Sequence, residues 1–156
     1  MGVLTGLLTA CSGFLLAVLW MDLMFDSQIR VAGRRVEQLP EPTLASIAGY
    51  YHRATTTSQP MGRLIAGVMV VLLGALTAEA FFGATPGWLL GVSAVLAGGP
   101  VVLALTRTVP NAVRLGRRAD TAVEQTRLAR AIYWDHLVCA LAMLGFLVLW
   151  LGWLGR

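Results

Sequence analysis

The sequence predicts an all-α integral membrane protein, a four-helix bundle formed by a single transmembrane domain. The chain has 156 residues, of which 57% are hydrophobic and 13% are charged, whereas soluble domains carry about 25% charged residues. Four apolar runs alternate with polar segments, and each run is long enough to cross a hydrocarbon core of about 30 Å as a helix. The expected spans cover residues 3–25, 61–82, 88–106 and 132–154.

The basic residues predict how the spans are oriented. All twelve are arginine, and eleven of them lie between residues 30 and 63 or between residues 107 and 130. Because arginine accumulates on the cytoplasmic side of a bilayer, both stretches are expected in the cytoplasm and both termini outside it. The predicted location is a bacterial-type inner membrane. The arginines flank spans, which argues against nucleic-acid binding and for contact with lipid headgroups.

The first span ends with two carboxylates on one face. Asp22 and Asp26 are four residues apart, at a helix C-terminus where the helix dipole disfavours negative charge. They are therefore expected to need positive partners, which Arg30, Arg34 and Arg35 could supply.

The first connection contains a loop and then a short amphipathic helix. Gly33, Pro40 and Pro42 predict a loop from residue 28 to residue 42. From Thr43 onward, apolar residues recur at helical spacing and predict a helix that lies on the inner membrane face or against the bundle. That predicted stripe consists of Leu44, Ile47, Tyr51 and Ala54.

The second half repeats the alternation of apolar and basic segments. Pro100 is expected to kink the third span, and residues 107–120 are expected to form the second cytoplasmic connection. Thr121 and Glu124 have the spacing of a capping box, which predicts one long helix running through the fourth span. Four tryptophans are expected to mark the membrane interfaces: Trp20 and Trp134 the inner one, Trp150 and Trp153 the outer one.

The candidate site is a polar layer at the inner ends of the spans, because ionisable residues inside spans are costly and often functional. Its predicted members are Asp22, Asp26, Tyr51, His52, Arg53, Asn111, Arg114, Asp135 and His136. Asp22, His136 and Tyr51 are the candidates for proton transfer or substrate orientation. In the alternative interpretation, the layer is a salt-bridge network that anchors the loops.

No metal and no cofactor are expected. Asp22, Asp26, His52 and His136 supply enough donors for one ion, but the Glu-x-x-His pair of di-iron bundles is absent from the sequence. Haem would need paired histidines within helices, which the sequence lacks. A pore is disfavoured because the central turns of all four spans are apolar.

Roughly the last third of the chain, together with the overall layout, resembles the anthrone-oxygenase-like family of small four-span membrane proteins. The resemblance rests on Arg107-Thr108-Val109-Pro110-Asn111 and on Trp134-Asp135-His136 entering the last span. It implies a cofactor-free oxygenase activity and nominates Asn111 and His136 as site residues. The family commonly has an asparagine and an arginine near the start of its last span, where this sequence has Asp135 and His136.

Two functions follow from these observations. The first is a non-catalytic component of a membrane complex, or a binder of lipid-like hydrophobic molecules. Its partners would be membrane lipids, other membrane-protein subunits or further copies of the chain. The second is a cofactor-poor membrane enzyme, oxygenase- or isomerase-like, that acts on an apolar substrate at the cytoplasmic interface.

Overall fold

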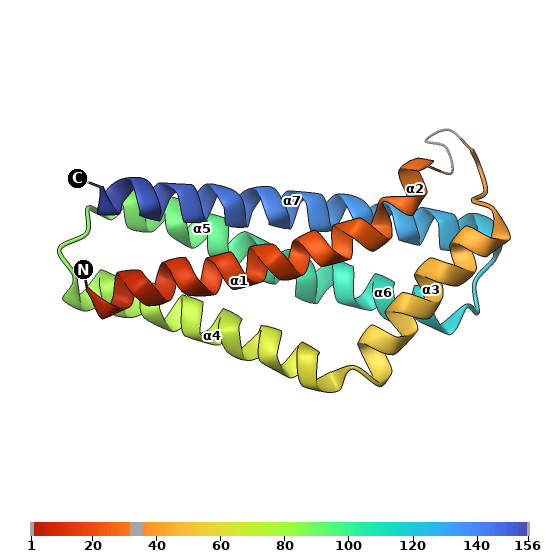
Figure 1. Ribbon diagram of the computed structural model, residues 1–156, viewed down its shortest axis with the longest axis horizontal. Coiled ribbons are helices and arrows are strands. Elements are labelled where there is room, and N and C mark those ends of the chain that lie inside the picture. Colours follow the sequence, from red (N-terminus) through yellow and green to blue (C-terminus); the bar gives the residue numbers. More distant parts are fainter. Residues whose placement is uncertain (1, 32–35, 156) are drawn as a thin grey trace.

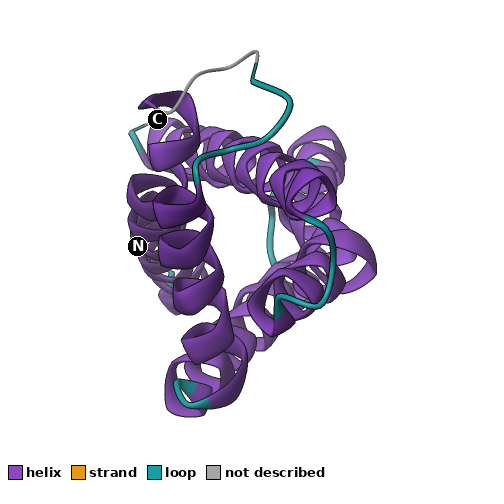
Figure 2. Ribbon diagram, turned by 90° about the vertical axis from the view of Figure 1, so that its right-hand side faces the viewer, coloured by secondary structure: helices purple, strands orange, loops and turns teal. Residues whose placement is uncertain are grey.

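The protein is a helical bundle, as the computed structural model shows for residues 2–31 and 36–155. These described residues form helices joined by short connections and contain no strand (Figure 2). Four helical segments are long and apolar enough to cross a membrane: Val3–Arg30, Pro60–Phe82, Gly87–Arg117 and Ala122–Leu154. The predicted all-α bundle with four apolar helices is therefore confirmed.

The four long segments form a closed ring of neighbours. Helix α1 (Val3–Asp26) contacts α7 (Ala122–Leu154) and α4 (Gln59–Phe82), and α5 (Gly87–Leu103) also contacts both α7 and α4. Both termini lie at one end of the bundle, and α3 (Glu41–Thr56) lies at the other end (Figure 1). The segments rich in arginine therefore gather at the α3 end.

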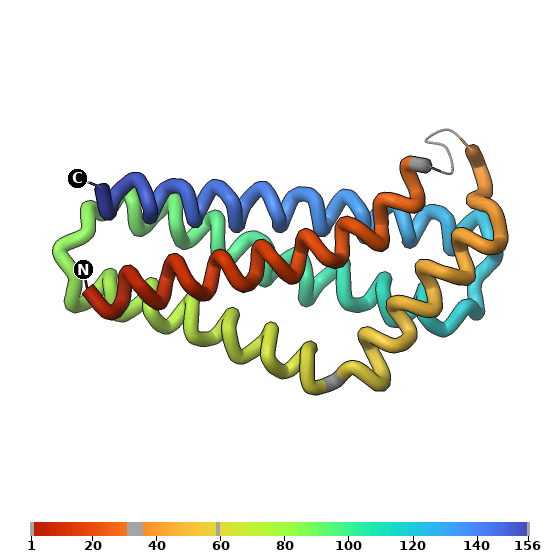
Figure 3. Tube along the Cα trace, in the orientation of Figure 1, coloured from red at the N-terminus to blue at the C-terminus, as the bar shows by residue number. Residues whose placement is uncertain are grey.

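Helix α4 separates from α1 as it approaches α3. The two helices lie close together near the chain termini and diverge toward the opposite end (Figure 3). At that end α3 crosses the bundle and packs against α6 (Val109–Arg117). Residues of α1, α4 and α6 line a cavity at this end of the bundle.

Two apolar clusters hold the bundle together. The cluster nearer the chain termini includes Leu8, Leu72, Phe146 and Trp150. Trp150 is fully buried, and its indole N–H donates to the Ser93 hydroxyl at 2.9 Å. Trp150 is therefore a core residue, and its expected place at the outer interface was wrong; a buried indole needs a hydrogen-bond acceptor, which Ser93 provides.

The second cluster joins α3, α6 and α7 at the other end. From α3 it contains Leu44, Ile47 and Tyr51, three of the four residues of the predicted stripe. The fourth, Ala54, is exposed. The amphipathic helix thus packs its apolar face against the bundle. This is one of the two arrangements that the sequence predicted, the other being a helix on the inner membrane face.

The third helical segment extends well beyond its predicted end. Helix α5 continues through a π-helical turn, η1 (Ala104–Thr108), and then through α6 to Arg117. The residues expected to form a loop from 107 onward are therefore helical as far as Arg117. Pro110 has no N–H to donate to the Thr106 carbonyl, and the π-helical turn accommodates the interruption without ending the helix.

The two connections near α3 differ in detail from the prediction. Residues Gln28–Val31 form a short helix, α2, where a loop was expected, whereas residues 32–35 lie outside the described part of the chain. After α6 the chain turns at Arg118, whose φ is 51°, and α7 begins at Ala122. The Thr121 hydroxyl accepts the Glu124 N–H, so the predicted cap is confirmed.

Candidate functional site

A buried carboxylate at the end of α1 is the centre of the candidate site. The Asp26 side chain is fully buried, and His136 Nδ1 on α7 lies 2.8 Å from its Oδ2 atom. The Tyr51 hydroxyl on α3 donates to Asp26 Oδ1 at 2.6 Å. Three helices that are distant in sequence therefore meet at one hydrogen-bonded cluster, defined here as Asp26, Tyr51 and His136.

The orientation of His136 follows from these bonds. Asp26 engages Nδ1, and a histidine nitrogen held by a carboxylate fixes both the ring and the preferred tautomer. The Tyr51 oxygen also lies 3.5 Å from the same nitrogen. Nε2 is consequently the ring nitrogen available to a bound molecule.

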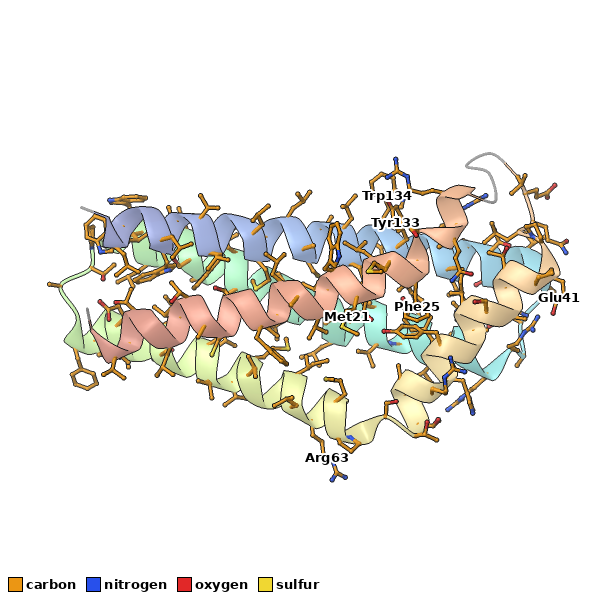
Figure 4. All side chains as sticks on the ribbon, in the orientation of Figure 1. Met21, Phe25, Glu41, Arg63, Tyr133 and Trp134 are labelled. Carbon is orange, nitrogen blue, oxygen red and sulfur yellow. The ribbon has the colours of Figure 1, made fainter. Side chains whose placement is uncertain are left out.

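A second carboxylate lies one helical turn earlier on α1. The Tyr50 hydroxyl donates a short hydrogen bond to Asp22 Oδ1, and the Tyr50 ring stacks on Phe25, with centroids 4.2 Å apart. Figure 4 shows Phe25 pointing from α1 toward α3. Burial raises the pKa of Tyr50, and the hydrogen bond to Asp22 raises it further, so this phenol remains a donor.

Burial likewise raises the pKa of Tyr51, and the nearby negative charge of Asp26 adds to the rise. Both tyrosines are thus fixed as hydrogen-bond donors to carboxylates. This pairing differs from the sequence-based expectation, in which arginines were to partner Asp22 and Asp26. In the structure, Arg30 instead donates to the Tyr133 hydroxyl at 3.3 Å, whereas Arg34 and Arg35 lie outside the described residues.

Asp135 belongs to a separate pair on the other side of α7. Its carboxylate lies 3.1 Å from Arg107 Nη2 and accepts the Thr108 hydroxyl at 3.2 Å. Consecutive residues on a helix point about 100° apart, which is why Asp135 and His136 face different neighbours. The polar layer is therefore divided into two clusters.

An apolar cavity of about 220 Å³ ends at His136, a member of the cluster formed by Asp26, Tyr51 and His136. Helices α1, α4, α5 and α7 form most of its walls, with η1 and the start of α6, and its described polar lining residues are Asp22, Thr108 and His136, apart from Cys139. The remaining lining residues are Leu15, Val18, Leu19, Ile65, Met69, Leu72, Leu73, Ala97, Pro100, Val101, Ala104, Val109 and Met143. Its composition suits a hydrophobic chain with one polar end.

A second cavity, of about 390 Å³, lies toward α3 and meets the first. Asp22, Thr108 and His136 line both cavities, and Tyr50, Tyr51 and Arg53 line the second alone. We call the first the inner cavity and the second the outer cavity. The carboxylate of Asp22 and the imidazole of His136 therefore stand at the junction between an apolar and a more polar space.

The structure brings together only part of the predicted layer. Asp22, Asp26, Tyr51 and His136 converge, and Arg53 is exposed at the wall of the outer cavity. His52 is exposed and Asn111 half-buried, and neither lines either cavity. Arg114 lies apart from the site, paired with Asp120 at 2.9 Å and Glu124 at 3.2 Å.

Three residues of the observed arrangement were absent from the predicted layer. Tyr50 was absent because adjacent Tyr51 was assigned to the buried face, and Arg107 and Thr108 because the third span was expected to end at residue 106. A helix reaching Arg117 places Thr108 beside Asp135 and against both cavities. Among the described residues, no group of three or more His, Cys, Asp or Glu side chains has an arrangement that could hold a metal ion.

Comparison of the chain with family models, with curated proteins and with solved structures finds no match in any of the three. Function has therefore to be argued from the two cavities and the groups at their junction.

Proposed function

We propose that this membrane protein binds a lipid-like hydrophobic molecule within its helical bundle. The observation that carries the proposal is the inner cavity, about 220 Å³ in volume, with apolar walls and polar groups concentrated at one end. A preformed apolar space with a few convergent polar groups is the usual form of a small-molecule site. The apolar part of the ligand would occupy the inner cavity, and its polar part would lie near Asp22 and His136.

The partners of the carboxylates support a binding role over a topology anchor. Anchoring carboxylates would be expected to pair with loop arginines, but Asp22 and Asp26 pair with tyrosines and a histidine. These pairs engage one oxygen of Asp22 and Nδ1 of His136, and both residues line the two cavities. Such an arrangement presents hydrogen-bonding groups to a ligand.

We also place the α3 end in the cytoplasm. The basic segments gather at this end, and positive side chains accumulate on the cytoplasmic side. In a bacterial-type inner membrane, the outer cavity of the protein would then lie at the depth of the lipid headgroups of the cytoplasmic leaflet. A lipid-like ligand would keep its polar end there and extend its chain toward the middle of the membrane.

Neighbouring valines on α5 provide the test. Val101 lines the inner cavity, whereas Val102 is 61% exposed on the surface of the bundle. Val101→Phe should fill the cavity, and Val102→Phe should add the same ring on the outside. Native mass spectrometry of protein extracted in its own lipids should show a discrete co-purified molecule with the wild type and Val102→Phe, and its loss with Val101→Phe.

Equal retention by both variants would contradict the proposed site. The same spectra test the complex-subunit alternative, because a defined protein partner with no small molecule would favour assembly over ligand binding.

A second candidate is a cofactor-poor enzyme, favoured by the Asp26–His136 pair. A carboxylate at Nδ1 orients the imidazole and stabilises its protonated form, which allows Nε2 to act as a general base toward a substrate in the cavity. Anthrone is the probe suggested by the family resemblance, and its oxidation by O₂ gives anthraquinone and water. Turnover should require His136 and survive His52→Ala, which alters the exposed histidine; turnover that persists in His136→Ala would exclude this role.

A further inference from the structure

We infer that the site selects an amphipathic molecule whose polar end is a protonated amine over one whose polar end is an anion. This inference rests on the proposed binding function and specifies its ligand. The charges at the cavity junction, the aromatic wall beside them and the hydrogen-bonding atoms that the protein leaves available all favour an amine.

The junction contains more acidic groups than basic ones. Asp22 and Asp26 are the two carboxylates of the site, and the His136 ring can offset at most one of them. Two arginines near the site bond to other groups: Arg107 pairs with Asp135, and Arg30 donates to the Tyr133 hydroxyl. In a poorly solvated site, an unbalanced carboxylate favours a cation and repels an anion.

The one arginine on the wall of the outer cavity does not reverse this balance. Arg53 is exposed, and its charge is therefore screened by solvent. Asp22, by contrast, lies where the outer cavity meets the inner one. A ligand whose chain fills the inner cavity would place its polar end at Asp22 before it reached Arg53.

When His136 is neutral with its proton on Nδ1, the atoms left for a ligand are hydrogen-bond acceptors. The Tyr50 hydroxyl occupies one oxygen of Asp22 and leaves the other for a ligand. His136 is 8% exposed, its Nδ1 is held by Asp26, and the residue lines both cavities. An ammonium group donates three hydrogen bonds and accepts none, so it complements these acceptors, whereas a carboxylate would face them with acceptors of its own.

The aromatic wall adds a further preference for a cation. The Tyr50 ring lines the outer cavity and stacks on Phe25, and it meets Tyr51 edge-on with centroids 5.2 Å apart. A cation near the face of such a ring is attracted by its quadrupole. The Tyr50 ring and the Asp22 carboxylate both line the outer cavity.

The opening between α1 and α4 gives a route from the bilayer. Met21 of α1 and Met61 of α4 line the outer cavity, and both are about half exposed, at 57% and 47%. Figure 4 shows Met21 in the region where α1 and α4 diverge. An amphipathic molecule in the bilayer could enter sideways here, with its charged end kept near the interface.

The experiment compares three single-chain probes of equal length: dodecylamine, dodecanol and dodecanoate. Each would compete against radiolabelled dodecylamine on wild-type protein in nanodiscs of a zwitterionic lipid, with empty nanodiscs subtracted. The amine should bind at least about tenfold more tightly than dodecanoate, with dodecanol between them. Asp22→Asn should remove this preference, and Asp22→Glu, which retains the carboxylate, should keep it.

Glu79→Gln is the matched control, because Glu79 lies at the opposite end of α4 and accepts the Thr85 hydroxyl. It should leave the preference unchanged. Dodecanoate binding as tightly as the amine, or an amine preference that survives Asp22→Asn, would overturn the inference while leaving the proposed function standing. Failure of all three probes to bind above the level seen with Val101→Phe would instead contradict the proposed function itself.

Discussion

Replacing Asp26 by alanine should destabilise the protein strongly, because this carboxylate joins three helices. It is fully buried and receives the Tyr51 hydroxyl at 2.6 Å and His136 Nδ1 at 2.8 Å. Each hydrogen bond to a charged group contributes about 1.5–3 kcal/mol, and removing one partner of a buried pair costs about 3–5 kcal/mol. Relief of the buried charge offsets part of this loss, so we expect Asp26→Ala to lower the free energy of unfolding by about 2–4 kcal/mol.

The assay is unfolding by SDS in mixed micelles, followed by far-ultraviolet circular dichroism. Asp120→Ala is the control, because Asp120 forms a solvent-exposed pair with Arg114 at 2.9 Å and exposed pairs contribute little. A double-mutant cycle with Tyr51→Phe separates the pairwise interaction from other effects. The reasoning fails if Asp26→Ala unfolds at the same SDS fraction as Asp120→Ala, or if Asp26 and Tyr51 show no coupling.

Two further predictions concern helix packing and ionisation. Gly116→Ala should destabilise the protein by about 1–3 kcal/mol, because a Cβ there would lie 2.9 Å from the backbone of His52. The control is Gly74→Ala, where the added Cβ meets no other atom within 4 Å. It should be neutral or stabilising in the same SDS titration. Because their pKa values are raised by burial and by the carboxylates, Tyr50 and Tyr51 should stay protonated in the folded protein above pH ~10, the ordinary tyrosine value. A raised folded-state pKa stabilises the protein fully below pH ~10 and progressively less above it. The free energy of unfolding should therefore fall with rising pH in the wild type, and less steeply in Tyr50→Phe. Phenolate absorbance that appears near pH ~10 without unfolding would contradict this.

Much of the fold follows directly from the sequence. Apolar runs of this length must satisfy their backbone groups internally, which makes membrane-spanning helices the expected structure. The Thr121 cap and the long α7 follow from one hydroxyl at the right spacing. The continuation of α5 into α6 was missed because Pro110 and a run of charged residues resemble a loop, and a π-helical turn has no sequence signature comparable to a cap.

The candidate site was predictable in composition but not in its pairing. The positions of Asp22, Asp26 and His136 along their helices placed all three at one level of the membrane. Their actual partners depend on the relative rotation of α1, α3 and α7, which sequence spacing within each helix does not determine. That rotation directs the tyrosines of α3, rather than the arginines beside it, toward the carboxylates. Arg114 was grouped with the site for the same reason: sequence spacing did not show that its partners are Asp120 and Glu124, on the connection after α6 and on α7.

The buried polar groups toward the two ends of the bundle are satisfied in different surroundings. Near the termini, the Trp150 indole and the Ser93 hydroxyl satisfy each other within an apolar cluster. Toward α3, the hydrogen-bonded polar groups border two cavities that share lining residues. Leu15, Leu72 and Met143 belong to the apolar cluster nearer the termini and also line the inner cavity, so core residues would enclose the proposed ligand.

Photolabelling with a long-chain amine that carries a diazirine at the end of its chain tests the central claim most directly. The account predicts adducts on the inner-cavity residues Val101, Cys139 and Met143, abolished by excess unlabelled amine. Adducts confined to surface residues such as Val102 and Val138, which are 61% and 54% exposed, would show that the molecule lies in the surrounding bilayer and would contradict an internal binding site.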